Sequence, residues 1–144
     1  MEVRKTLNSA IVATSAMTAF SYLASWLIKQ NFKEPKLLGD MLEPTLPHRA
    51  KALSTPGGWA AHYCFGLTWS LMLIEYIKAA NIKNSAENGL IIGSVGGLTA
   101  IACWKFLFDS HPCPPKTHRR NFYAQLFLAH LIFTGTLMAT NRKG

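Results

Sequence analysis

Histidine is the side chain in this sequence best suited to chemistry near neutral pH, because an unperturbed imidazole changes its charge at about pH 6.5. Two of the five histidines lie inside apolar segments, His62 within residues 58–77 and His130 within residues 122–140. An ionisable group in such a segment is costly in lipid and faces protein or water. The two imidazoles therefore predict a polar pocket between helices. Alternatively, they could ligate haem or a metal ion, or His130 could only form a hydrogen bond between helices.

Three further ionisable residues are predicted to lie at the same end of the protein as the two helical histidines. Lys105 and Asp109 stand one helical turn apart near the end of a third apolar segment, where a simple i, i+4 ion pair is the structural alternative. The candidate polar pocket therefore comprises His62, Lys105, Asp109, His111 and His130. No catalytic motif is recognised, so no catalytic residue is assigned and enzymatic activity is not predicted.

A zinc site would need more ligands than the two helical histidines provide. Cys113 lies between His111 and His118, but the prolines of HPCPP do not match a recognised zinc-finger spacing. The three cysteines are an odd number and imply no complete disulfide framework. No cofactor is therefore expected, and haem or a metal ion bound by His62 and His130 is the alternative.

The elements that must position these side chains are four apolar segments. They cover residues 7–28, 58–77, 88–108 and 122–140. Each is long enough for a helix that crosses the hydrocarbon core, which takes roughly 20 residues. None shows the charged face that a helix of a soluble bundle would carry. The sequence therefore predicts an all-α integral membrane four-helix bundle, with residues 1–144 forming a single transmembrane domain.

The charged residues lie almost entirely between the apolar segments. Fifteen Lys and Arg against seven Asp and Glu give a formal charge of +8. This distribution favours a membrane protein over a nucleic-acid binder, for which no folded reader is recognised. Lys116, Arg119 and Arg120 have no acidic neighbour in residues 110–121. They predict a basic rim that contacts anionic phospholipid headgroups.

Four spans would place both termini and residues 78–87 on one side of the membrane, with residues 29–57 and 109–121 on the other. Eight Lys and Arg lie on the side of the long loops and six on the side of the termini, including Arg142 and Lys143. The positive-inside tendency therefore leans toward cytoplasmic long loops. A margin of two charges leaves the orientation open.

Small residues recur at helical spacing in the apolar segments. Because lipid gives helices little hydrophobic drive to associate, such faces are typical helix contacts. Three faces are predicted: Gly89, Gly93 and Gly97; Thr14, Thr18, Ser21 and Ser25; and His62, Gly66 and Ser70.

The first connection is longer than a simple turn requires. Within it, PKLLGDML could form a brief turn lying at the membrane interface, with Leu37, Leu38, Met41 and Leu42 facing lipid. An irregular surface loop is the alternative.

Three stretches resemble small, uncharacterised four-span bacterial inner-membrane proteins, the YagU-like and related families. These stretches are GGWAAHYCFGLTW, GLIIGSVGG and KFLFDSHPCPPKTHRRNFYAQLFLAH. The resemblance implies an integral membrane helical bundle in a bacterial inner membrane. It implies no established activity and assigns a role to no residue.

The function expected from these features is that of a structural or accessory subunit of a membrane assembly. Its partners would be membrane lipids and either other protein subunits or further copies of the chain. The first alternative is a haem- or metal-binding redox protein that uses His62 and His130. The second is an oligomeric, proton-linked permeation unit.

Overall fold

The computed structural model describes residues 2–141, and no strand occurs among them. The helices are α1 (Glu2–Ile28), α2 (Glu34–Leu42), η1 (Glu43–Thr45), η2 (His48–Leu53), α3 (Ser54–Ala79), α4 (Ala86–Ser110) and α5 (Arg119–Thr140). The four long helices contain the four predicted apolar segments and extend beyond them. Arg142 and Lys143, which entered the charge comparison, lie outside the described residues.

Three of the long helices, α1, α4 and α5, are long and apolar enough to cross a membrane. Helix α3 has 26 residues but does not meet the same condition. Its sequence carries His62, Glu75 and several glycine and hydroxyl residues, which lower its apolar character. The prediction of an all-helical chain is therefore confirmed for the described residues, and three helices are candidates for membrane spans, whereas the count of four spans is not confirmed.

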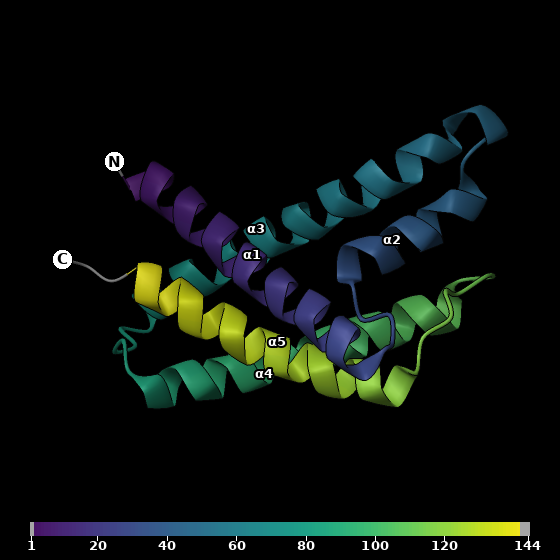
Figure 1. Ribbon diagram of the computed structural model, residues 1–144. Coiled ribbons are helices and arrows are strands. Elements are labelled where there is room, and N and C mark those ends of the chain that lie inside the picture. Colours follow the sequence, from purple (N-terminus) through teal and green to yellow (C-terminus); the bar gives the residue numbers. More distant parts are fainter. Residues whose placement is uncertain (1, 142–144) are drawn as a thin grey trace.

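The long helices run back and forth between two ends of the molecule (Figure 1). The start of α1, the end of α5 and the turn between α3 and α4 lie at one end, and α2 lies toward the other. Helix α4 packs along α5, and α1 packs against both α5 and α3. Within the described part of the chain, α3 and α4 scarcely touch each other directly. Their separation leaves room for the site described below.

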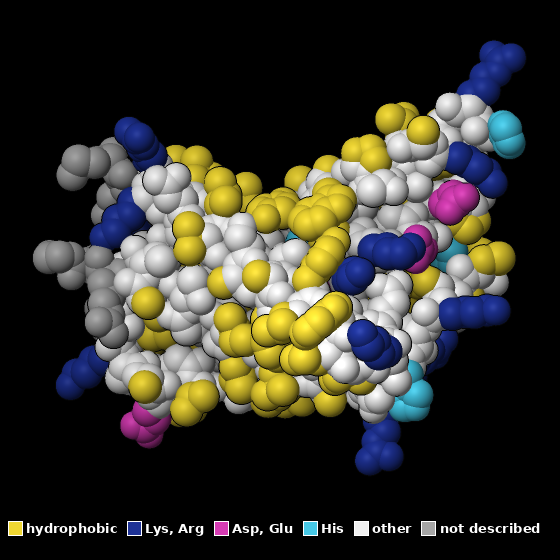
Figure 2. Space-filling view, viewed as in Figure 1, with side chains coloured by type: hydrophobic (Ala, Val, Ile, Leu, Met, Phe, Trp, Pro, Cys, Tyr) yellow, Lys and Arg dark blue, Asp and Glu magenta, His cyan; other side chains and the backbone are white. Residues whose placement is uncertain are grey.

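The surface of the bundle is rich in large apolar side chains. Trp26, Phe65 and Phe106 are each 65–70% exposed, and many aliphatic side chains are about half exposed. Figure 2 shows hydrophobic side chains across the middle of one face, with Lys and Arg mainly toward its two ends. Exposed apolar area on this scale marks an interaction surface in a soluble protein, but it suits a protein surrounded by lipid tails.

The glycines of α4 form a helix contact, as their spacing predicts. Gly89, Gly93 and Gly97 are all buried and face α5. A Cβ at Gly93 would lie 3.2 Å from the Cα of Leu131, and one at Gly97 would lie 3.2 Å from the Cα of Phe127. Side chains at these positions would push the two backbones apart, so the glycines permit the close packing of α4 on α5.

The closest approach in the bundle occurs where α2 crosses α3. A Cβ at Gly58 of α3 would collide with the carbonyl oxygen of Pro35 and lie 2.8 Å from the Cα of Gly39. In return, a Cβ at Gly39 would lie 2.9 Å from the carbonyl oxygen of Ser54. The two backbones therefore touch, and this contact holds α2 inside the bundle.

Both expectations for the PKLLGDML segment are wrong. Residues 34–42 form a helix, and Leu37 and Met41 are buried in a core cluster together with Phe108 and Phe122, where they were expected to face lipid. Leu38 is partly buried and packs against the same cluster. Leu37 and Met41 share one helical face, and the crossing of α2 over α3 turns that face toward the bundle.

The crossing of α2 over α3 predicts a large effect of Gly58→Ala. The added methyl group would meet backbone atoms, which cannot rotate away, so we expect a loss of about 3 kcal/mol in stability, the upper part of the usual range for overpacking. Gly135→Ala is the matched control, because nothing lies within 4 Å of a Cβ at Gly135. Thermal unfolding in detergent, followed by circular dichroism, measures both. Equal melting temperatures for the two variants would contradict the contact.

Candidate functional site

A groove of about 240 Å³ lies between α3 and α4, where the two helices diverge. Phe65, Trp69 and Met72 line it from α3, and Ala100 and Trp104 line it from α4. We call it the α3–α4 groove. Side chains of α1 and α5 also line it, and α2 contributes Glu34 and Leu38. Apart from its inner polar groups the lining is apolar, as in most small-molecule sites.

The inner polar group of the groove is Glu34, the first residue of α2. Its side chain is 1% exposed. The carboxylate oxygen Oε1 lies 2.8 Å from the Ser21 hydroxyl, and the Gln125 amide donates a hydrogen bond of 2.6 Å to the same hydroxyl. The second carboxylate oxygen, Oε2, is buried and has no hydrogen-bond partner among the described residues. Three elements, α1, α2 and α5, therefore meet at one buried carboxyl group.

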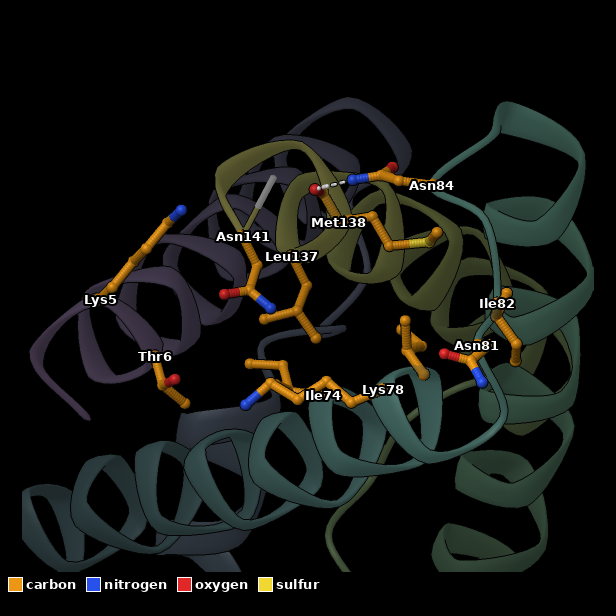
Figure 3. A pocket seen from close by; sticks show the side chains of 11 residues that line it. Lys5, Thr6, Ile74, Lys78, Asn81, Ile82, Asn84, Leu137, Met138 and Asn141 are labelled. Atoms are coloured by element: carbon orange, nitrogen blue, oxygen red, sulfur yellow. Dashed lines mark hydrogen bonds between the residues drawn. The ribbon is translucent and has the colours of Figure 1, made fainter. Parts of the chain in front are cut away.

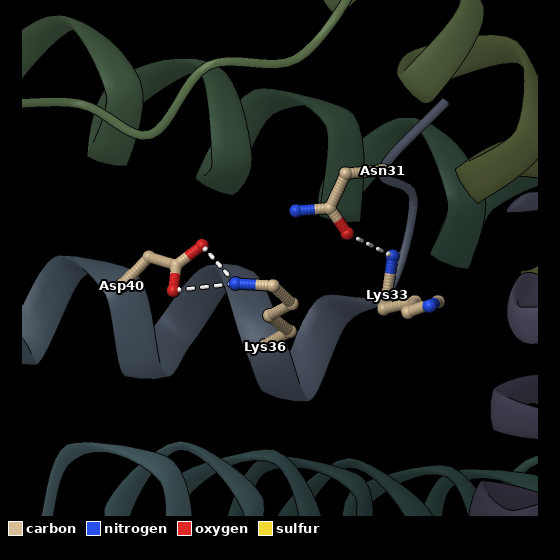
Figure 4. A network of polar contacts seen from close by, with 4 residues as sticks. All are labelled: Asn31, Lys33, Lys36 and Asp40. Carbon is tan, nitrogen blue, oxygen red and sulfur yellow. Dashed lines mark hydrogen bonds and ion pairs between the residues drawn. The ribbon is translucent and has the colours of Figure 1, made fainter. Parts of the chain in front are cut away.

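The cations nearest to Glu34 along the chain are engaged elsewhere. Lys36 Nζ binds both carboxylate oxygens of Asp40, at 2.9 and 3.0 Å (Figure 4). Lys33 Nζ lies over the ring of Tyr22, 5.1 Å from its centroid, while its backbone N–H contacts Asn31. Among residues 2–141, no lysine or arginine forms an ion pair with Glu34. The carboxyl group is thus buried without a counter-charge.

Burial without a counter-charge changes the acid strength of this group. Desolvation raises the pKa of Glu34 to about 7, and hydrogen bonds from Ser21 and Gln125 only partly oppose the rise. Both protonation states are therefore populated near neutral pH. Ser21 has a single hydroxyl hydrogen, which can go to Glu34 or to the carbonyl oxygen of Met17 at 3.0 Å. A proton on Glu34 can thus be accommodated by turning one hydroxyl.

The two helical histidines line the same groove. His62 Nε2 lies 2.8 Å from the Thr18 hydroxyl, which itself donates to the carbonyl oxygen of Thr14 at 2.7 Å. The imidazole N–H is therefore the donor to Thr18. His130 Nδ1 donates to the carbonyl oxygen of Leu126 at 2.9 Å. The groove thus brings together Glu34, His62 and His130.

The other three members of the predicted pocket lie elsewhere. Lys105 Nζ is 2.6 Å from Asp109, which also accepts from Arg119 at 2.7 Å, and all three side chains are exposed. His111 Nε2 lies 2.9 Å from the carbonyl oxygen of Met41. The structure therefore does not place Lys105, Asp109 or His111 in the α3–α4 groove. Lys105 and Asp109 lie in the last two turns of α4 and His111 directly follows that helix, and none of the three belongs to the lining of the groove.

The predicted basic rim is exposed along its length. Lys116, Arg119 and Arg120 are all accessible, but Arg119 is paired with Asp109 and stacks over the ring of Phe108. Its charge is therefore partly compensated within the protein. Contact of this rim with lipid headgroups stays a prediction.

Sequence reasoning missed Glu34 and Gln125. The hydroxyl face of α1 was the available signal, because Thr14, Thr18, Ser21 and Ser25 are all buried as predicted. Three of these hydroxyls have a hydrogen-bond partner on another element, namely His62, Glu34 and the backbone N–H of Phe32, whereas Thr14 packs against Gly66 and its hydroxyl has none. A face of four hydroxyls indicates that polar partners lie opposite it, but it does not identify them.

A second and wider cavity, of about 530 Å³, lies at the other end of the bundle (Figure 3). Lys5, Lys78 and Asn84 are on its lining, and Asn84 donates to the carbonyl oxygen of Met138 at 2.7 Å. Lys78 is paired with the exposed Glu75. Of the side-chain atoms in residues 2–141 that are buried without a partner, none belongs to its lining. We therefore assign the functional site to the α3–α4 groove.

Metal ligands do not cluster in the described part of the chain. No group of three or more His, Cys, Asp or Glu side chains is arranged there to hold an ion. The three cysteines are free and exposed. Comparison of the chain with protein-family models, with curated proteins and with solved structures finds no match. The chain is thus defined by its helical fold and its three membrane-span candidates, and the resemblance to YagU-like proteins stays a prediction.

The burial of Glu34 predicts that stability depends on pH. Because its pKa is about 7 in the folded chain and 4.5 in its ordinary state, the folded chain binds more protons between these values. Stability should therefore fall as the pH rises from about 4.5 to about 7, by on the order of 3 kcal/mol, and then level off.

Glu34→Gln keeps the shape of the side chain and removes this dependence. The difference in unfolding free energy between wild type and variant, measured in detergent from about pH 5 to about pH 8.5, isolates Glu34 from the histidines. A difference that stays constant over this range would contradict a buried carboxyl group without a counter-charge.

Proposed function

We propose that this chain is a four-span integral membrane protein that binds a small, lipid-soluble molecule in the α3–α4 groove, as an accessory subunit of a membrane assembly. The observation that carries the proposal is the unpaired oxygen Oε2 of Glu34, buried at the inner end of an otherwise apolar groove. A buried polar atom without a partner is costly, and of the seven such side-chain atoms among the described residues only Glu34 Oε2 and the indole nitrogen of Trp69 belong to residues that line the groove.

A second unpaired polar atom in the groove supports the same proposal. The indole N–H of Trp69 is buried and finds no acceptor among the described residues. Trp69 and Glu34 both line the groove, so the residues that carry one unpaired donor and one unpaired acceptor belong to the same site. A molecule with an apolar body and a polar group fits such a lining better than lipid tails alone.

The opening of the groove supports entry from lipid. Phe65 and Met72 on the α3 side are 65% and 58% exposed, and Thr99 and Cys103 on the α4 side are also exposed. No lysine or arginine is among the lining residues. With α3 as a fourth span, this uncharged mouth would face the hydrocarbon core. A molecule dissolved in the bilayer could then enter sideways between the two helices.

The geometry of α3 supports the fourth span. Its 26 residues correspond to about 39 Å of helix, more than the roughly 30 Å hydrocarbon core. Its polar groups are accommodated, because His62 faces Thr18 and Glu75 pairs with Lys78 near the end of the helix. Ionisable groups in spans face partners in this manner.

A haem- or metal-binding redox protein is the second candidate, because His62 and His130 line one groove. Their placement on two helices fits a pair of axial ligands. The absorption spectrum of the purified protein tests it: a Soret band that disappears in His130→Ala would favour this candidate over the proposal.

We expect that filling the groove abolishes binding of an apolar probe. A Cβ at Gly96 would lie 3.5 Å from the Trp69 indole nitrogen and 3.9 Å from the His130 ring, so Gly96→Leu would occupy the groove. Gly135→Leu is the control, because its side chain enters open space. The probe is 1-bromo-4-neopentylbenzene, whose bromine quenches the fluorescence of tryptophans that it touches, including Trp69 and Trp104.

Saturable quenching in detergent should be present in wild type and in Gly135→Leu and at least tenfold weaker in Gly96→Leu. Circular dichroism confirms that both variants are folded. The same saturable quenching in both variants would show that the probe binds elsewhere and would defeat the proposal.

A further inference from the structure

We infer that the ligand of the α3–α4 groove is a lipophilic organic cation, which the carboxylate of Glu34 binds in exchange for a proton. This inference rests on the proposed binding function and names the chemical class of the ligand. It is argued from charge complementarity, from the walls of the groove and from the groups that surround Glu34.

Charge complementarity is the first argument. Glu34 is almost fully buried, its Oε2 atom is unpaired, and the groups that contact Oε1 are neutral. Lys33 and Lys36 have other partners, a tyrosine ring and Asp40. A carboxylate buried in a protein interior without a cation is far from its lowest free energy. A cation that enters from outside supplies the missing charge.

The walls of the groove are the second argument. Phe65, Trp69, Trp104 and Phe133 line it, and the face of an aromatic ring attracts an organic cation as well as an apolar body. The volume of about 240 Å³ suits a molecule with one aromatic ring and a compact ammonium group. The lining holds few polar groups, so a phosphate or a sugar would find too few partners.

Other ionisable groups near Glu34 do not supply the missing charge. Tyr22 on α1, which interacts electrostatically with Glu34, cannot carry a positive charge, while His62 on α3 and His130 on α5 line the same groove, and each imidazole has a hydrogen bond that a neutral ring can make. On α2 itself, Asp40 holds Lys36. The exchange is balanced: a protonated Glu34 releases one proton as one cation binds to its carboxylate.

The exchange implies that acid competes with the cation. Because the pKa of Glu34 is about 7, the carboxylate is the main form at about pH 8 and a minor one at about pH 5.5. Cation affinity should therefore fall more than tenfold between these conditions, while the affinity of a neutral molecule should change little.

The test uses a matched pair of probes in the quenching measurement described above. The cationic probe is 4-bromobenzyltrimethylammonium, which has nitrogen where the neutral probe, 1-bromo-4-neopentylbenzene, has carbon. At about pH 8 the cation should bind wild type at least tenfold more tightly than the neutral probe. Glu34→Gln should bind both probes alike. Asp40→Asn, which removes an acid from the same helix, should keep the preference of wild type.

Release of a proton provides a measurement on the unaltered chain. In weak buffer at about pH 6.5, cation binding should release most of one proton per site, and binding of the neutral probe should release none. If the neutral probe binds and the cation binds no more tightly, or if no proton is released, the inference is overturned and the proposed function stands. If neither probe binds in a saturable manner, both are overturned.

Discussion

The crossing of α2 over α3 at Gly39 and Gly58 is the contact on which the groove depends. One side of α2 touches the backbone of α3, while Leu37 and Met41 enter a core cluster that also contains side chains of α4 and α5. Helix α2 therefore lies between the N-terminal half of α3 and α4 and keeps these two helices apart (Figure 1). Glu34, the first residue of α2, is thereby buried in the interior. A groove and its buried carboxyl group thus result from one close approach of two backbones.

The hydroxyl face of α1 supplies hydrogen-bond partners for polar groups that this arrangement buries. In an apolar surrounding every polar group needs a partner, and α1 offers one hydroxyl per turn to the elements that pack on it. The Thr18 hydroxyl accepts a hydrogen bond from His62. The Ser21 hydroxyl donates to Glu34 and accepts from Gln125. The Ser25 hydroxyl accepts from the backbone N–H of Phe32, where the chain turns toward α2. Seven buried side-chain polar atoms among the described residues nevertheless have no hydrogen-bond partner, Glu34 Oε2 and Thr14 Oγ1 among them.

Length and apolar content were sufficient to predict the four long helices, and four-residue spacing was sufficient to predict the glycine contact of α4 with α5. The face of a helix on which a given residue lies was harder to predict. Connectivity placed Lys105 and Asp109 at the correct end of α4, but their face is fixed by how α4 packs on α5, which the sequence does not state. Helix α2 was harder still, because nine residues form a stable helix mainly through the packing that surrounds them.

The sequence of α2 explains why Glu34 has no counter-charge of its own. On a helix, side chains three or four positions apart can pair, whereas those two apart point in different directions. The positions that could reach Glu34 hold Leu37 and Leu38, while Lys36 is two residues away and pairs with Asp40, four residues further along. A positive charge for Glu34 must therefore come from another helix or from outside the chain. The neighbouring side chains on α1 and α5, Ser21 and Gln125, are neutral, so the structure favours a source outside the chain.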